Sequence, residues 1–188
     1  MIIYLNKSEF DYCKQLSDQK RADAIKYGLK DNYNFIKKSD YNYAVNNISF
    51  KTETEDRGLR GEYVVAKALN LIKNWNYRLA NPLIKEKKQP DIIGNTGTIY
   101  EVRTPNKRFG KLIVREGDRY DAHYILATEL DLYTYKIVGW TMGVVAMQDC
   151  YWSAPDPKRE LCWAVPQNKL FDFKEILNKE LGVDKRVL

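Results

Sequence analysis

The chain has 188 residues, with 31 lysines and arginines against 25 aspartates and glutamates, which gives a formal net charge of +6. At roughly 150 residues per domain, this length supports one domain with an appendage. The composition, 44% hydrophobic and 30% charged, is typical of a globular protein and not of a disordered or fibrous one. The longest apolar runs, at residues 1–5 and 143–147, fall far short of the ~20 residues that span a bilayer, so we expect no membrane helix.

Two residue types exclude several kinds of chemistry. The 3 cysteines stand at no CxxC spacing, which argues against a disulfide scaffold or a cysteine zinc site and favours a reducing, cytoplasmic location. Because the chain has 1 histidine, His123, every site that needs two histidines is excluded, and a Ser-His-Asp triad would have to use this residue. Chemistry by this chain would therefore rest on carboxylates, lysines and arginines.

The N-terminal part of the chain predicts a short strand and helices. Residues 1–5 form the expected strand, and Ser8 begins a helix that ends near Gly28. Residues 31–51, rich in Asn, Asp, Ser and Tyr, have no clear period and predict a connecting segment. Thr52 with Glu55 matches the capping-box pattern, so the next helix is expected to begin there.

The remainder of the chain predicts a run of strands and a closing helix. Asp172 caps that last helix and Gly182 ends it. This order favours an α/β or α+β sheet domain over residues 54–188, preceded by an N-terminal helical extension and connecting segment over residues 1–53. The expected strands cover residues 75–80, 91–94, 98–103, 112–115, 122–128 and 135–140.

Residues 91–103 predict a hairpin that brings two carboxylates together. A three-residue turn centred on Thr96 places Asp91 opposite Glu101, and opposed side chains share one face with Cβ atoms about 4.5–5.5 Å apart. Two like charges at that distance need a positive charge between them, and a hard divalent cation such as Mg²⁺ is a candidate. Arg103, two residues beyond Glu101, is expected on the same face.

The hairpin has two other interpretations. A four-residue turn would place Asp91 opposite Tyr100 and separate the carboxylates. Alternatively, Asp91 merely follows Pro90 at a strand edge, while Glu101 and Arg103 form a surface ladder.

A third carboxylate lies on the apolar stripe of the helix that follows Thr52. Glu62 is three residues after Leu59 and four before Ala66, so it is not on the solvated face. A carboxylate in that position needs a cation or a hydrogen-bond donor, unless its stem packs at the edge of the stripe and its head reaches water.

Three short motifs occur in an order that resembles the PD-(D/E)XK nuclease superfamily: Glu62 within Gly61-Glu-Tyr-Val-Val-Ala66, then Pro90-Asp91, then Glu101-Val-Arg103. Residues 135–140 and 163–170 also resemble the end of small phage and restriction-type members. The resemblance covers about residues 54–177. It implies a restriction-endonuclease-like core, with a central mixed β-sheet flanked by helices.

The resemblance also implies a Mg²⁺-dependent phosphodiester hydrolase, most simply a DNA endonuclease in which Mn²⁺ can substitute. Asp91 and Glu101 would hold the metal, and the carbonyl of Val102 would complete its shell. Glu62 would bind the metal directly, through water, or at a second metal. Arg103 takes the place of the usual lysine, and an arginine can orient water and stabilise negative charge but cannot act as a general base.

The arginine leaves several alternatives open. The lysine could be supplied by Lys107 or Lys111, or the chain could be a nucleic-acid-binding or inhibitor protein that keeps the nuclease fold without cutting. Another nuclease class, the GIY-YIG type, is faintly echoed by Gly97-Thr-Ile-Tyr100. That interpretation lacks a second tyrosine triplet and leaves Pro90-Asp91 unexplained.

Half of the net charge lies beside the proposed site. Between Glu101 and Arg119 there are six basic and three acidic residues, a local net charge of +3. Such clustering predicts nucleic-acid binding. The resemblance to the nuclease superfamily favours DNA over RNA, and cutting both strands of a duplex would call for a homodimer. The expected phosphate contacts are Lys87, Lys88, Lys107, Arg108, Lys111 and Arg115.

Overall fold

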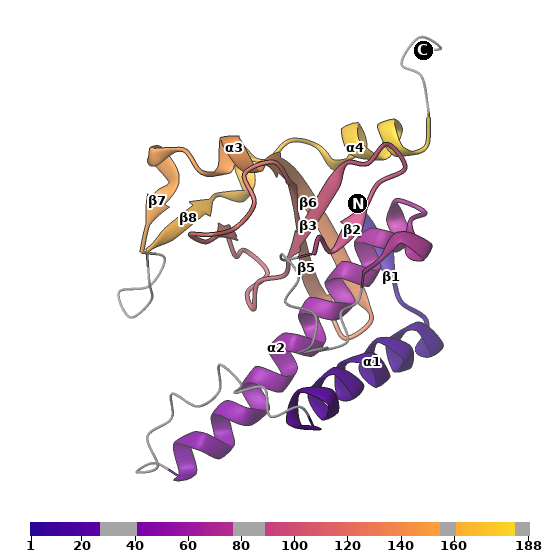
Figure 1. Cartoon of the computed structure of the whole chain (residues 1–188), viewed down its shortest axis with the longest axis vertical. Coiled ribbons are helices and arrows are strands. Elements are labelled where there is room, and N and C mark those ends of the chain that lie inside the picture. The colour runs from indigo at the N-terminus through magenta and orange to yellow at the C-terminus, as the bar shows by residue number, and fades with distance from the viewer. Residues whose placement is uncertain (27–40, 77–88, 155–160, 183–188) are drawn as a thin grey trace.

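The computed structural model describes residues 1–26, 41–76, 89–154 and 161–182. Over these ranges the chain is a mixed α/β protein with two β-sheets, as Figure 1 shows. None of the helices in these ranges is long and apolar enough to cross a membrane. The helices are α1 (Lys7–Lys26), α2 (Tyr41–Ala68), α3 (Gly143–Ala146) and α4 (Phe173–Glu180), with short 3₁₀ turns at Ile72–Asn74, Asp149–Tyr151 and Gln167–Lys169.

The main sheet has five strands in the order β1-β6-β5-β3-β2. Strands β3 and β5 run parallel and the other neighbours antiparallel, so the expected mixed sheet is confirmed. The bounds of its strands are β1 (Ile2–Tyr4), β2 (Ile92–Ile93), β3 (Ile99–Arg103), β5 (His123–Asp131) and β6 (Thr134–Met142).

A second, antiparallel sheet has the order β4-β8-β7. It lies beside α3 at one end of the main sheet (Figure 1). Its strands are β4 (Leu112–Val114), β7 (Trp152–Ser153) and β8 (Cys162–Val165). The crossover from β3 to the parallel β5 passes through β4, so the chain leaves the main sheet immediately after Arg103 and returns at His123.

The two faces of the main sheet are covered by different elements. Tyr100 and Val102 of β3 pack in one buried cluster with Val64 of α2. On the opposite face, Tyr124 and Leu126 of β5 pack with residues of β4 and β8. Because side chains alternate along a strand, Glu101 and Arg103 project away from α2, toward the second sheet.

Most of the predicted elements are confirmed, and two predictions about α2 are wrong. The expected strands at residues 1–5, 112–115, 122–128 and 135–140 are present within a few residues, and Asp172 caps α4 by accepting the N–H of Lys174 at 3.0 Å. Residues 41–51 are helical instead of a connecting segment, and Thr52 lies inside α2 instead of capping it. No Gly or Pro occurs between residues 41 and 57, so nothing in this stretch stops a helix.

Two further expectations meet the limits of the structure. The boundary after residue 53 falls within the continuous helix α2, and residues 31–40 of the expected connecting segment lie outside the described ranges. Of the strand expected over residues 75–80, Trp75 forms an isolated bridge to Ile92, and residues 77–80 lie outside those ranges.

Helix α2 is fixed to the main sheet by a half-buried charged network. The two oxygens of Glu129 on β5 accept N–H groups from Arg57 Nε at 2.8 Å and Arg60 Nη2 at 2.9 Å. Tyr135 on β6 accepts from Arg60 Nε at 2.8 Å and donates to Glu129 Oε1 at 2.9 Å. Burial raises the pKa of Glu129, but hydrogen bonds from Arg57, Tyr135 and Arg60 outweigh it and lower the pKa. This network holds in place the helix that carries Glu62.

We predict that Glu129→Ala lowers the free energy of unfolding by about 3 kcal/mol, because removing one partner of a buried pair leaves its cations uncompensated. Urea denaturation followed by circular dichroism measures the change. The control is Glu116→Ala in an exposed turn, where a change within about 0.5 kcal/mol is expected. Equal stability of the two variants would show that the network does not fix α2.

Candidate functional site

The hairpin of β2 and β3 has the register that the sequence predicts. Ile92 pairs with Tyr100 and Ile93 with Ile99, so a continuation of the same register places Asp91 opposite Glu101. The turn is closed by a hydrogen bond from Gly94 N to the carbonyl of Thr98 at 2.8 Å. The three-residue turn is therefore confirmed, and the four-residue alternative is wrong.

Asp91 is held by backbone groups on both sides. Its Oδ2 accepts the N–H of Val102 at 2.8 Å, and its carbonyl accepts the N–H of Asn76 at 2.8 Å. The side chain of Asp91 thus accepts a main-chain N–H of β3 at a position just beyond the end of the β2–β3 pairing. This hydrogen bond keeps the Asp91 carboxylate beside Glu101, which is only 1% exposed.

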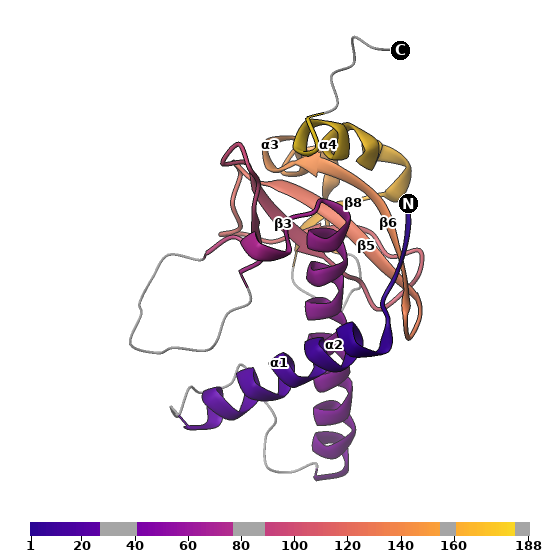
Figure 2. The ribbon, with the colours of Figure 1, turned by 90° about the vertical axis from the view of Figure 1, so that its right-hand side faces the viewer.

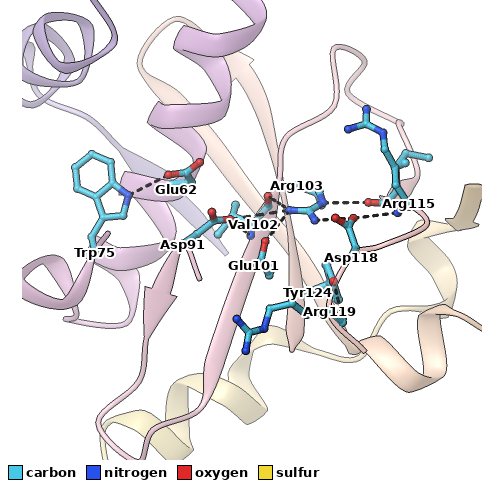
Figure 3. Close-up of polar contacts among 11 residues, drawn as sticks. Glu62, Trp75, Asp91, Glu101, Val102, Arg103, Arg115, Asp118, Arg119 and Tyr124 are labelled. Carbon is cyan, nitrogen blue, oxygen red and sulfur yellow. Dashed lines mark hydrogen bonds and ion pairs between the residues drawn. The ribbon is translucent and has the colours of Figure 1, made fainter. Parts of the chain in front are cut away.

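The positive charge between these carboxylates is the guanidinium of Arg103 (Figure 3). Its Nη1 lies 3.3 Å from Glu101 Oε2, 3.1 Å from the carbonyl oxygen of Val102 and 4.0 Å from Asp91 Oδ2. These three oxygens are the metal ligands that the resemblance to the PD-(D/E)XK superfamily implies. The oxygens converge on one point, and a side-chain cation occupies it.

The rest of the Arg103 side chain is held by the segment that leaves the main sheet. Nη2 donates to Asp118 Oδ2 at 3.0 Å, and Nε donates to the carbonyl of Ile113 on β4 at 3.1 Å. The guanidinium carbon lies 5.0 Å from the centre of the Tyr124 ring. Asp118 also accepts the N–H of Arg115 at 2.9 Å, which fixes the turn that carries it.

Asp118 and Tyr124 belong to the cluster although no motif in the sequence predicts them there. A signal was nevertheless present, because Asp118 follows Gly117, and this Gly-Asp pair marks a turn just after a predicted strand. Gly117 adopts a φ of 81°, a conformation that glycine reaches without strain.

The cluster keeps Arg103 charged. Burial by itself lowers the pKa of the guanidinium, but the carboxylates of Asp118, Asp91 and Glu101 outweigh burial and raise it. A guanidinium with a raised pKa is protonated throughout the physiological range, so Arg103 cannot accept a proton from water. Its chemistry is limited to donating hydrogen bonds and neutralising negative charge.

Glu62 is separate from this convergence. Its Oε2 accepts the indole N–H of Trp75 at 3.2 Å, and in Figure 3 it lies on the Asp91 side of the cluster, away from Arg103. Trp75 thus supplies the donor that a carboxylate on an apolar stripe needs. In the part of the chain that the structure describes, no group of three or more His, Cys, Asp and Glu side chains is arranged to hold a metal.

The oxygens of Asp91, Glu101 and Val102 are nevertheless of the chemical kind that a hard divalent cation binds. Two carboxylates and a backbone carbonyl are the oxygen ligands that Mg²⁺ accepts, and Mg²⁺ usually keeps several waters in addition. The Arg103 guanidinium is a stand-in for the cation, since its Nη1 donates to Glu101 Oε2 and to the carbonyl of Val102 and lies 4.0 Å from Asp91 Oδ2. A metal at this point requires that Nη1 withdraw and that the oxygens close in, because Mg²⁺ binds its oxygen ligands at about 2.0–2.1 Å.

The basic residues predicted to contact nucleic acid lie on the surface. Lys107, Arg108, Lys111 and Arg115 are exposed in the loops at either end of β4, whereas residues 87 and 88 lie outside the described ranges. His123 is stacked on Trp140, with ring centres 5.0 Å apart, and burial lowers its pKa. His123 thus packs within an aromatic cluster and takes no part in the cluster around Arg103.

Comparisons of the chain with protein-family models, with curated proteins and with solved structures find no match. What the site can do is therefore argued from its own geometry.

We predict that Arg103→Met lowers the free energy of unfolding by about 3 kcal/mol, because it removes the cation that three carboxylates share. Chemical denaturation at neutral pH in EDTA measures the loss. The matched control is Arg119→Met, since the pair of Arg119 with the half-exposed Asp121 contributes at most about 1 kcal/mol. A loss no larger than that of the control would show that the carboxylates do not depend on Arg103.

Proposed function

We propose that this protein is a divalent-metal-dependent nuclease that hydrolyses phosphodiester bonds in DNA, built on a restriction-endonuclease-like core. One observation carries the proposal: the oxygens of Asp91, Glu101 and Val102 surround a single cation position at the open end of the β2–β3 hairpin. The ordered motifs around Glu62, Asp91 and Glu101 support the same class.

In this proposal Asp91, Glu101 and the carbonyl of Val102 hold the metal. The metal, Mg²⁺ or Mn²⁺, supplies activation of water and neutralisation of charge on the phosphate. Asp91 is oriented for this role by the N–H of Val102, and Glu101 by its burial between the two sheets. Glu62, held by Trp75, lies on the Asp91 side of the cluster, and from there it would orient a water ligand of the metal.

Arg103 has a second role once its Nη1 has left the metal position. The guanidinium is a rigid plane, so Nη1 leaves only when the whole group turns, and the carbonyl of Ile113 and the carboxylate of Asp118 are the acceptors that keep the turned group beside the site. A tethered arginine can donate to phosphate oxygens and stabilise the charge that develops in the transition state. The exposed cations of the β4 loops would bind the flanking phosphates.

An alternative function, a nucleic-acid-binding protein that does not cut, is favoured by one specific observation. Arg103 Nη1 already donates hydrogen bonds to Glu101 and to the carbonyl of Val102, two of the oxygen ligands that a metal would use. If the guanidinium never leaves, the site is a structural ion cluster, and only the exposed cations act on nucleic acid.

We predict that the purified protein cuts DNA in Mg²⁺ or Mn²⁺ and that EDTA stops the reaction. Asp91→Asn and Glu101→Gln keep the shape of each side chain and remove its charge. Each is expected to lower the rate at least as much as the roughly 10- to 100-fold that supporting residues of metal sites contribute. Plasmid nicking measures the rates, with Asp121→Asn as an exposed carboxylate control. Undiminished cutting in both site variants would place the activity elsewhere.

We also predict that Arg103→Met binds Mn²⁺ more tightly, on the order of tenfold, because two cations compete for the same oxygens and one is removed. Isothermal titration calorimetry in the absence of DNA measures the affinity, and Arg119→Met is the control for a lost surface charge. The same variant should lose cleavage, since the phosphate donor is gone. Unchanged or weaker Mn²⁺ binding would mean that Nη1 and the metal do not share a site.

A further inference from the structure

The two loops at the ends of β4 each expose an aromatic ring. Phe109, in the loop before β4, is 83% exposed, and Tyr120, in the loop after it, is 72% exposed. β4 itself touches the candidate site, because the carbonyl of Ile113 accepts the N–H of Arg103 Nε at 3.1 Å. The rings are therefore presented on either side of the strand that borders the site.

The loop that carries Phe109 is held in a fixed shape. The side-chain amide of Gln167 donates to the carbonyls of both Arg108, at 3.1 Å, and Gly110, at 3.0 Å. Gly110 also donates its N–H to the carbonyl of Lys107 at 2.8 Å, which closes a turn around Phe109. The backbone on both sides of Phe109 is thus fixed by hydrogen bonds. The conformation of the loop therefore directs the ring outward.

The loop that carries Tyr120 is fixed as well. The hydroxyl of Tyr124 donates to the carbonyl of Arg119 at 2.7 Å. Gly143 approaches so closely that a Cβ there would lie 2.5 Å from the carbonyl oxygen of Tyr120. Asp118 ties the start of the same loop to Arg103. This exposed ring is thus attached, through its own loop, to the candidate site.

The surroundings of Phe109 are cationic. No acidic residue occurs between Val102 and Arg115, and the guanidinium carbon of Arg108 lies 5.9 Å from the centre of the Phe109 ring. Lysine is depleted at protein–protein interfaces, whereas Lys107 and Lys111 flank this ring together with Arg108, so the composition of the loop does not favour a protein partner. Rings that alternate with cations match single-stranded nucleic acid, whose bases stack on the rings while its phosphates meet the cations.

We infer that Phe109 and Tyr120 are stacking platforms for unpaired bases, and that the protein prefers single-stranded or locally unpaired DNA. In a duplex each base face is covered by its neighbours, so an exposed ring gains nothing from it. An unpaired base can place its face on the ring. The inference deepens the proposed function by naming its substrate class, and it rests on that function only for the statement that the bound DNA is a substrate.

The test is the affinity of the full-length protein for a labelled single strand and for the duplex of the same sequence, by fluorescence anisotropy in EDTA. Phe109→Ala is expected to weaken single-strand binding on the order of tenfold and duplex binding by less than about twofold. Phe109→Trp should retain single-strand binding. Since the ring is 83% exposed, the alanine variant should fold normally. The control is Leu132→Ala, an exposed apolar side chain at the turn between β5 and β6.

An equal effect of Phe109→Ala on both forms of DNA, or no effect on either, would overturn the inference. The same holds for a Phe109→Trp variant that binds as weakly as Phe109→Ala. Its failure is distinguishable from failure of the proposed function. Metal-dependent cutting with no response to Phe109→Ala overturns only the inference, whereas Phe109-dependent single-strand binding without cutting supports it and overturns only the nuclease.

Discussion

Two carboxylates that face one another across a hairpin cannot both stay ionised in a buried site unless they share a positive charge. That requirement governs the region around β3. It accounts for the position of Arg103 across Glu101 and Asp91. Asp118 and the carbonyl of Ile113 accept hydrogen bonds from the other two nitrogens of the same guanidinium, which ties the next loop and β4 to the main sheet. The two proposed functions differ in this shared charge. In the binding protein it is always a guanidinium, and in the nuclease a divalent cation replaces the guanidinium during catalysis.

The cluster lies between the two sheets, and this position strengthens its ion pairs. Glu101 faces the second sheet and not α2, so water reaches it poorly and ion pairs there are less screened than on a surface. Trp75 and Glu62 lie on the other side of Asp91. Figure 2, turned a quarter from Figure 1, shows the end of α2 against the sheet and α1 crossing α2 beyond the sheet, so α2 covers the face opposite the cluster.

The parts of the structure that sequence could predict are those set by local rules. A turn length fixes the register of a hairpin, so the opposition of Asp91 and Glu101 followed from counting residues. Contacts between distant segments have no such rule, and for that reason Asp118 and the bond from Trp75 to Glu62 were not foreseen. The start of α2 is not predicted correctly from the sequence, because a polar, Asn-rich composition indicates a connecting segment and the structure has a helix there. Tertiary context overrides such weak preferences.

The closeness of Arg103 to Glu101 along the chain bears on how the protein folds. The hairpin joins residues about ten apart, and such hairpins form in roughly 1–10 μs. The bonds that fix α2 to the sheet join Arg57 and Arg60 to Glu129, across 72 and 69 residues, and closing such long loops is slower. We therefore expect the two carboxylates to meet early in folding, before the rest of the domain surrounds them. A counter-ion two residues away in the same strand is present at that moment, at any concentration of free metal.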